Sequence, residues 1–86
     1  MTAGRGTRRE PRLRLIATFP TTTAAIAMER DCRRAGLPGK LIPVPRSISA
    51  SCGMAWCALP EEREVLEGAV PSDPAIRVEG WYYVMF

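Results

Sequence analysis

Residues 13–36 have the sequence LRLIATFPTTTAAIAMERDCRRAG, which carries the clearest signals for strand and helix in the chain. Its first part, from Leu13 to Phe19, is short and predominantly apolar, and Pro20 follows it directly. A run of this kind, bounded by a proline, is typical of a buried β-strand. The apolar residues after the threonines recur at helical spacing. The stretch therefore predicts a central strand followed at once by a helix.

The predicted helix has clear signals at both of its ends. Thr21 or Thr22 can cap its start, and Gly36 ends it. Glu29 and Arg33 stand four residues apart and predict an exposed ion pair. The inner face is predicted from the apolar positions that share one side of the helix: Ala25, Met28, Cys32 and Ala35. On this interpretation Cys32 is a core residue and not a metal ligand.

Two further strands are predicted on either side of a serine-rich loop. Residues 40–44 form a short strand, and the prolines at its end place it at or near the edge of a sheet. Residues 53–59 alternate in a way that favours a third strand, with Trp56 and Cys57 facing opposite sides.

The last third of the chain predicts a brief helix and a final strand. Pro60 is placed well for a helix start, and the acidic residues after it favour the first turn. The apolar side of this helix is predicted to consist of Val65, Leu66, Ala69 and Val70. Residues 76–78 and 81–85 complete the chain as strand, with Gly80 as a bulge. The order strand, helix, strand, strand, helix, strand predicts an α+β fold of the ferredoxin-like βαββαβ type, with two helices on one face of an antiparallel sheet.

Composition divides the chain into a leader, residues 1–12, and one domain, residues 13–86. The leader holds four arginines and one glutamate, whereas the remaining residues carry eight charges of each sign. A disordered basic leader on a neutral body argues against a nucleic-acid-binding fold, which would spread Lys and Arg over one face. No stretch reaches the roughly 20 apolar residues of a transmembrane helix, so no membrane contact is expected.

Histidine is absent and three cysteines are present. A Ser-His-Asp or Cys-His pair is therefore excluded, as is any zinc site that uses imidazole. The cysteine spacing fits neither a disulfide framework nor paired metal knuckles, and it favours reduced thiols in the cytoplasm. We expect no cofactor and no metal, and a carrier protein more than a stand-alone enzyme.

The candidate site is the loop between the second and third strands, whose sequence is PVPRSISASCG over residues 43–53. A cysteine is nucleophilic as its thiolate, which nearby cations and hydrogen-bond donors favour. The loop supplies Arg46 and two serines, Ser49 and Ser51, around Cys52. If the chain performs chemistry, we expect Cys52, reachable from solvent, to perform it. The alternative is a small, flexible loop whose thiol packs inward.

Cys57 follows Cys52 closely enough to offer a second thiol. It could resolve an oxidised form of Cys52 as a disulfide, or share a metal with it. The metal alternative has little support, because three soft ligands fall short of a closed structural site.

Two motifs carry a resemblance to a known family. Pro45-Arg46-Ser47-Ile48-Ser49 followed by Ser51-Cys52-Gly53-Met54-Ala55 resembles a family of small bacterial proteins described as selenium/sulfur carrier protein-like. Weaker similarity runs from residue 16 through residue 80. The arginine-rich leader and Cys57 depart from the family pattern.

The resemblance implies a small cytoplasmic carrier that accepts sulfur or selenium on Cys52 as a persulfide or selenosulfide and passes it to a partner enzyme. It implies anion-stabilising roles for Arg46, Ser49, Ser51 and Gly53, and a donor such as a cysteine desulfurase. The alternative is a non-catalytic module in which this loop binds a protein or an anion and Cys52 is incidental or redox-sensing. The choice of sulfur or selenium, the partner's identity and a homodimer formed through an exposed strand edge stay open.

Overall fold

The computed structural model describes residues 11–69 and 76–86, and its elements alternate between strand and helix. Residues 1–10 of the predicted leader and Val70 of the predicted second helix lie outside the described residues. The elements are β1 (Leu13–Thr18), α1 (Thr22–Ala35), β2 (Lys40–Pro43), β3 (Met54–Ala58), a 3-10 turn η1 (Pro60–Glu62), α2 (Arg63–Ala69) and β4 (Gly80–Met85).

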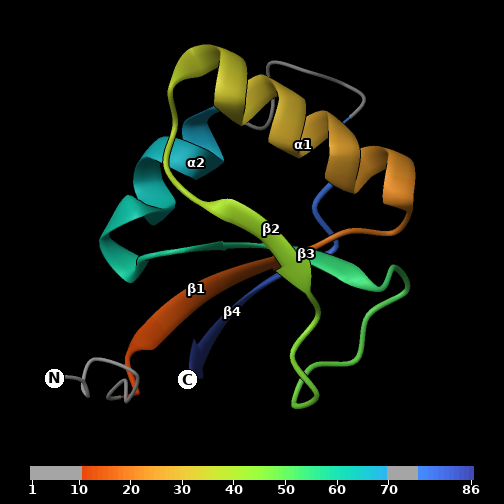
Figure 1. Cartoon of the computed structure of the whole chain (residues 1–86), viewed down its shortest axis with the longest axis vertical. Helices are drawn as coiled ribbons and strands as arrows, with labels where there is room; N and C mark the ends of the chain where they lie inside the picture. The colour runs from red at the N-terminus through yellow and green to blue at the C-terminus, as the bar shows by residue number, and fades with distance from the viewer. Residues whose placement is uncertain (1–10, 70–75) are drawn as a thin grey trace, which may run out of the picture.

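The strands form one antiparallel sheet in the order β2-β3-β1-β4, with both helices on one side (Figure 1). The apolar strand β1 lies in the middle, where Ile16 pairs with Cys57 of β3 and with Tyr82 of β4. The predicted α+β architecture is confirmed, and so is the edge position of β2, because in the described sheet β2 pairs with β3 alone. Arg12 extends the pairing beyond β1 through two backbone hydrogen bonds with Phe86, of 3.2 and 3.1 Å.

The ends of α1 follow from local chemistry, as predicted. Thr21 is the N-cap, and its hydroxyl accepts a hydrogen bond from the Ala24 N–H at 3.1 Å. Gly36 adopts the left-handed conformation with φ of 72°, and the Leu37 N–H then reaches the Cys32 carbonyl at 2.8 Å. The exposed pair of Glu29 and Arg33 forms at 3.4 Å.

The sheet separates two apolar clusters. Between the sheet and the helices lies the helix-side core, whose largest members are Leu15, Phe19, Met28, Trp56 and Leu66. The rear face, opposite α1, carries a smaller cluster of Ile16, Ile48, Ala55 and Cys57. The predicted alternation of β3 is thus confirmed, because successive side chains of a strand point to opposite faces. Cys32 is buried in the helix-side core, also as predicted.

The turn from α1 into β2 depends on Gly39. Its φ of 116° is strained for any residue with a side chain, and a Cβ there would overlap the indole nitrogen of Trp56. The same nitrogen donates a hydrogen bond to the Pro38 carbonyl at 3.1 Å. The Trp56 indole therefore packs against Gly39 and fixes the turn that leads into β2.

Several details of the helical predictions are wrong. Ala35, the last residue of α1, is exposed and does not belong to the inner face. The predicted helix start at Pro60 is confirmed, but its first turn, η1, is a 3-10 turn, in which the Glu62 carboxylate accepts a hydrogen bond from the Leu59 N–H at 2.7 Å. Val65 is 48% exposed, because a helix this short buries one side and Leu66 occupies it.

The predicted final strand is also shorter at its start. Residues 76–79 form no regular strand, although the Glu79 N–H reaches the Thr18 carbonyl. Gly80 pairs directly with Thr18 in an uninterrupted ladder, so the predicted bulge is wrong. Strand β4 begins where its pairing with β1 begins.

Candidate functional site

The loop of residues 44–53 connects the edge strand β2 to β3 and extends beyond both of them (Figure 1). Its base is closed by a hydrogen bond from the Val44 N–H to the Gly53 carbonyl at 3.0 Å, and the Ile48 N–H closes a turn onto Pro45 at 3.0 Å. Ile48 packs on the rear face, whereas Cys52 joins the helix-side core. The two side chains thus anchor the loop on both sides of the sheet.

Cys52 lies beside the N-terminus of α1. The backbone N–H of Met54 donates a hydrogen bond to Cys52 Sγ at 3.4 Å. Thr22 Oγ1, on the first residue of α1, lies 3.7 Å from the same sulfur in a hydrogen bond that either atom can donate. Hydrogen-bond donors and the positive end of a helix dipole both stabilise negative charge on an adjacent atom. The sulfur therefore has polar contacts suited to an anion.

The expected solvent exposure of Cys52 is wrong, because the residue is only 5% exposed. Burial on one side comes from the helix-side core. Its neighbours Ser51 and Gly53 are both exposed, so the sulfur lies directly beneath the surface of the loop. Little of Cys52 is therefore open to solvent in this structure.

Ser51 contacts a carboxylate instead of the thiol. Its hydroxyl donates to Glu79 at 2.6 Å and its backbone N–H donates to the same carboxylate at 3.2 Å. These two hydrogen bonds, the hydroxyl's first, hold the pKa of Glu79 below its usual range. Glu79 belongs to the segment that leads into β4, so this contact fastens the Cys52 loop to the far end of the chain.

The other three predicted site residues are exposed on the same loop. Among the described residues, none forms a hydrogen bond or ion pair with the side chains of Arg46 or Ser49. Gly53 does not have a positive φ, and a Cβ built on it meets nothing within 4 Å. These residues are therefore close to Cys52 in the sequence, but the Arg46 side chain does not contact the Cys52 sulfur.

The three free thiols have separate environments. Cys57 points to the rear face and Cys52 to the helix side, so the structure does not bring the proposed resolving thiol to Cys52. Burial, followed by the charge of Asp31, raises the pKa of Cys32. Cys32 is therefore held in its uncharged, poorly nucleophilic form at neutral pH.

Sequence reasoning missed two residues at the site, Thr22 and Glu79. The sequence indicates Thr22 only as a possible helix cap, and no local pattern marks Glu79 as a neighbour of the loop. Within residues 11–69 and 76–86, no three Cys, Asp or Glu side chains are grouped so that they could hold a metal ion. None of the helices in the same residues has the length and apolar character needed to cross a membrane.

Comparison with known proteins gives one family. The family model described as "Putative Se/S carrier protein-like" matches residues 14–83. A DNA-directed RNA polymerase subunit beta' of Chlorobium phaeovibrioides is 34% identical over 91% of this chain, but the chain spans only 6% of that subunit's length. No solved structure matches. The matched family range contains every predicted site residue.

Proposed function

Because the chain belongs to the family described as "Putative Se/S carrier protein-like", we propose that it carries sulfur or selenium on Cys52 and delivers it to a partner enzyme. The observation that carries this assignment is the placement of Cys52 Sγ against the Met54 N–H and the first residue of α1. Cys32 Sγ is buried and forms no hydrogen bond with any residue that the structure describes, and Cys57 lies on the other side of the sheet.

The loading step is a thiol exchange without net oxidation. The Cys52 thiol first loses its proton to solvent, and the thiolate attacks the outer sulfur of a donor's persulfide. A new S–S bond forms on Cys52 Sγ while the donor's S–S bond breaks, and the electron pair leaves on the donor's cysteine. The same exchange with a donor's selenosulfide transfers selenium. The Met54 N–H and the Thr22 hydroxyl stabilise the charge on Cys52 before the attack.

Access to the sulfur is proposed to require movement of the loop. The Ser51–Glu79 contact holds the loop closed over the 5% exposed thiol. A docking partner that engages Ser51 would release Glu79 and open the loop. Gly53 leaves room for close approach of the partner backbone, and Arg46 and Ser49 contact the partner or the transferred anion.

The remaining parts of the proposal concern fold type and location. We assign the ferredoxin-like arrangement on the strand order β2-β3-β1-β4, in which β1 and β3 lie side by side at the centre of the sheet. In the chain, one helix precedes β2 and the other precedes β4. The three free thiols support a reducing compartment, the cytoplasm.

The test is intact-mass analysis after incubation with a cysteine desulfurase and cysteine. We expect a gain of one sulfur atom, about 32 Da, that a thiol reductant removes. Cys52→Ser abolishes the gain, whereas the matched Cys57→Ser retains it. No gain in the wild type, or a gain that persists in Cys52→Ser, would contradict the proposal.

Burial of Cys52 favours a second candidate, a non-catalytic binding module. In that case the loop contacts a partner through its exposed residues, and the thiol only fills space in the helix-side core. Competitive alkylation at neutral pH separates the two candidates. A carrier requires Cys52 to react faster than Cys32, and a binding module does not.

A further inference from the structure

The sheet has two edge strands, and they differ in how well they are protected from further pairing. At one edge, β2 has four residues, begins with Lys40 and ends with Pro43. Short length, lysine and proline all hinder the addition of another strand. At the other edge, β4 has six residues and contains neither proline nor a charged residue. Among the residues that the structure describes, β4 pairs with β1 alone (Figure 1). β4 is therefore the edge open to a further strand.

The outer side of β4 presents unpaired backbone groups. Arg12 and Phe86 exchange both of their backbone hydrogen bonds, at 3.2 and 3.1 Å. Pairs of this kind alternate along an antiparallel ladder, so residues 82 and 84 also bond to β1. The backbone N–H and C=O groups of Trp81, Tyr83 and Met85 then point to the open side. They are arranged as an added antiparallel strand requires.

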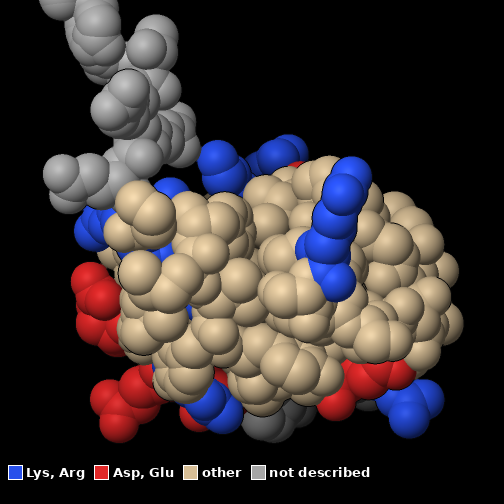
Figure 2. Space-filling view, turned by 90° about the horizontal axis from the view of Figure 1, so that it is seen from below, with Lys and Arg blue, Asp and Glu red and all other residues tan. Residues whose placement is uncertain are grey.

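Apolar side chains surround the same edge. Most of the large apolar side chains that the described residues expose lie on β4 or directly beside it: Leu13, Tyr82, Tyr83, Met85 and Phe86. Seen from the end of the molecule at which β4 finishes, the surface is largely uncharged, with acidic side chains toward its margins (Figure 2). A contiguous apolar surface of this kind marks an interaction site.

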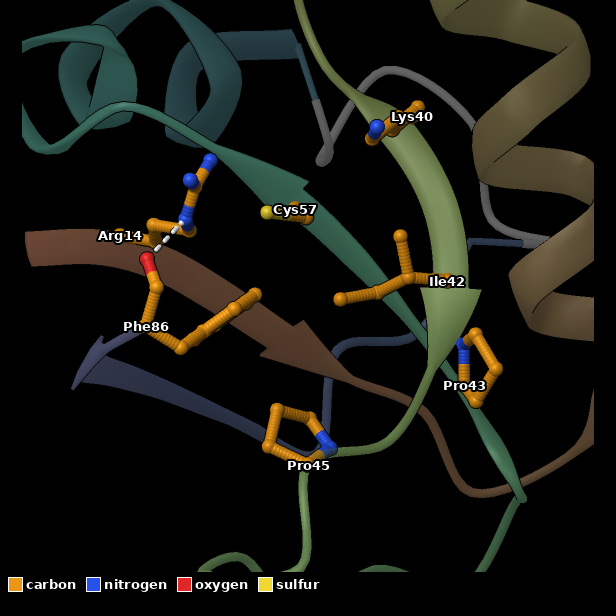
Figure 3. A pocket seen from close by; sticks show the side chains of 7 residues that line it. All are labelled: Arg14, Lys40, Ile42, Pro43, Pro45, Cys57 and Phe86. Carbon is orange, nitrogen blue, oxygen red and sulfur yellow. Dashed lines mark hydrogen bonds between the residues drawn. The ribbon is translucent and has the colours of Figure 1, made fainter. Parts of the chain in front are cut away.

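Two arginines beside β4 are already paired within the chain. The Arg63 guanidinium lies 5.5 Å from the centre of the Tyr83 ring, and its Nε contacts the Glu67 carboxylate at 3.1 Å. The Arg14 Nε donates to the Phe86 backbone oxygen at 2.7 Å (Figure 3). Neither arginine therefore brings an unpaired positive charge to this edge.

We propose that two copies of this chain associate through β4, each adding its strand to the sheet of the other. An antiparallel pairing centred on Tyr83 sets Tyr83 opposite its own copy and Trp81 opposite Met85 of the second copy. Every outward N–H and C=O group of these residues then meets a partner across a two-fold axis. The second copy is the occupant that supplies a matching uncharged strand by itself.

Side chains add to this backbone pairing. Trp81 packs against the helix-side core, so Tyr83 and Met85, at alternate positions of the same strand, face that side as well. The two Tyr83 rings would lie side by side, and each Met85 thioether would lie beside an indole. The proposal does not depend on sulfur transfer, because it uses no residue of the Cys52 loop.

The test is analytical ultracentrifugation of the full chain from about 1 µM to 1 mM, where we expect reversible dimerisation. Arg63 also lies 5.6 Å from the centre of the Trp81 ring, so Met85→Lys places a like charge near Arg63 of the second copy. Because this contact occurs twice, the dimer should weaken about ten-fold. Ile26→Lys adds the same charge at a similarly exposed apolar position of α1 and should leave the dissociation constant unchanged.

Amide hydrogen exchange measured by NMR locates the contact. The N–H groups of Tyr83 and Met85 should exchange more slowly in concentrated than in dilute samples, because only the second copy can bond them. The Val84 N–H, which already bonds to β1, should depend less on concentration.

Three results would overturn the proposal. One is a monomer at every concentration. Another is an equal dissociation constant in Met85→Lys and Ile26→Lys, which would place the contact elsewhere or assign the effect to net charge. The third is concentration-dependent protection in β2 instead of β4. Sulfur loading of Cys52 is measured separately, and its outcome leaves this proposal unchanged.

Discussion

Cys52 and Cys57 are equally buried, each 5% exposed, yet the structure surrounds them differently. Cys52 contacts a backbone N–H and a hydroxyl at the start of a helix, whereas Cys57 lies on the rear face between two cationic side chains. Exposure therefore does not distinguish the two thiols. The groups that lie near each sulfur do: hydrogen-bond donors contact Cys52, whereas Arg14 and Lys40 line the same pocket as Cys57.

The largest expected effect comes from Gly39, in the turn between α1 and β2. Gly39→Ala introduces a Cβ that overlaps Trp56 and approaches the Cys57 carbonyl to 2.8 Å, at a φ that disfavours side chains. We expect a loss of about 3 kcal/mol in the free energy of unfolding, from strain and overpacking together. Both thiols should then become reactive, because β3 no longer separates two packed clusters. Denaturant unfolding and alkylation of each cysteine measure the two effects.

Gly68→Ala provides the control for this substitution. A Cβ at Gly68 meets nothing within 4 Å, and the residue lies within α2. The variant should gain about 0.5–1 kcal/mol of stability, because alanine favours helix. A similar loss in both glycine variants would show that the Trp56 contact is not the cause.

The middle-sized effect tests the polar environment of Cys52 directly. Thr22→Val removes the hydroxyl 3.7 Å from Cys52 Sγ and keeps the shape of the side chain. Loss of a hydrogen bond worth about 1 kcal/mol should slow alkylation of Cys52 about five-fold at neutral pH. Cys57, on the rear face, should react unchanged, as measured by mass spectrometry of the alkylated peptides.

Thr23→Val serves as the matched control. Thr23 is exposed on the same turn of α1, so the substitution has the same effect on helix propensity without touching the sulfur. Equal slowing in Thr22→Val and Thr23→Val would show that the α1 terminus acts on Cys52 only through helix stability.

Local signals in the sequence predict much of this frame. The cap at Thr21 or Thr22, the stop at Gly36 and the opposite directions of Trp56 and Cys57 depend on neighbouring residues. All three agree with the structure, in which Thr21 is the cap. Val65 is apolar but exposed, which local signals do not predict. Which side chains of a short helix are buried depends on how the helix packs on the sheet.

The site itself depends on contacts between distant parts of the chain. Thr22 and Glu79 lie 30 and 28 residues from Cys52 and Ser51, respectively. No local pattern indicates which residue will approach the loop once the sheet is assembled. The cysteine could be selected from the sequence, but the groups that touch it and its burial could not.

The smallest expected effect concerns the Ser51–Glu79 contact. Because the pKa of Glu79 is lowered in the folded protein, its hydrogen bonds contribute stability fully above the usual carboxyl pKa of about 4.3. This contribution is lost as the pH falls through the lowered value. Glu79→Gln should therefore remove part of the acid dependence of the unfolding free energy, which denaturant unfolding across about pH 3–6 measures.

Glu79→Gln also tests whether the Ser51–Glu79 contact or the packing of the helix-side core keeps Cys52 covered. Glutamine accepts a weaker hydrogen bond from the Ser51 hydroxyl than a carboxylate does, so the loop should open more often and Cys52 should alkylate faster at neutral pH. Cys57 should not change, provided that Ile48 stays packed in the rear-face cluster that covers it. Glu61→Gln removes an exposed carboxylate that forms no hydrogen bond or ion pair with the loop among residues 11–69 and 76–86, and it should alter neither thiol. Unchanged alkylation of Cys52 in Glu79→Gln would mean that the helix-side core, and not this carboxylate, keeps the thiol covered.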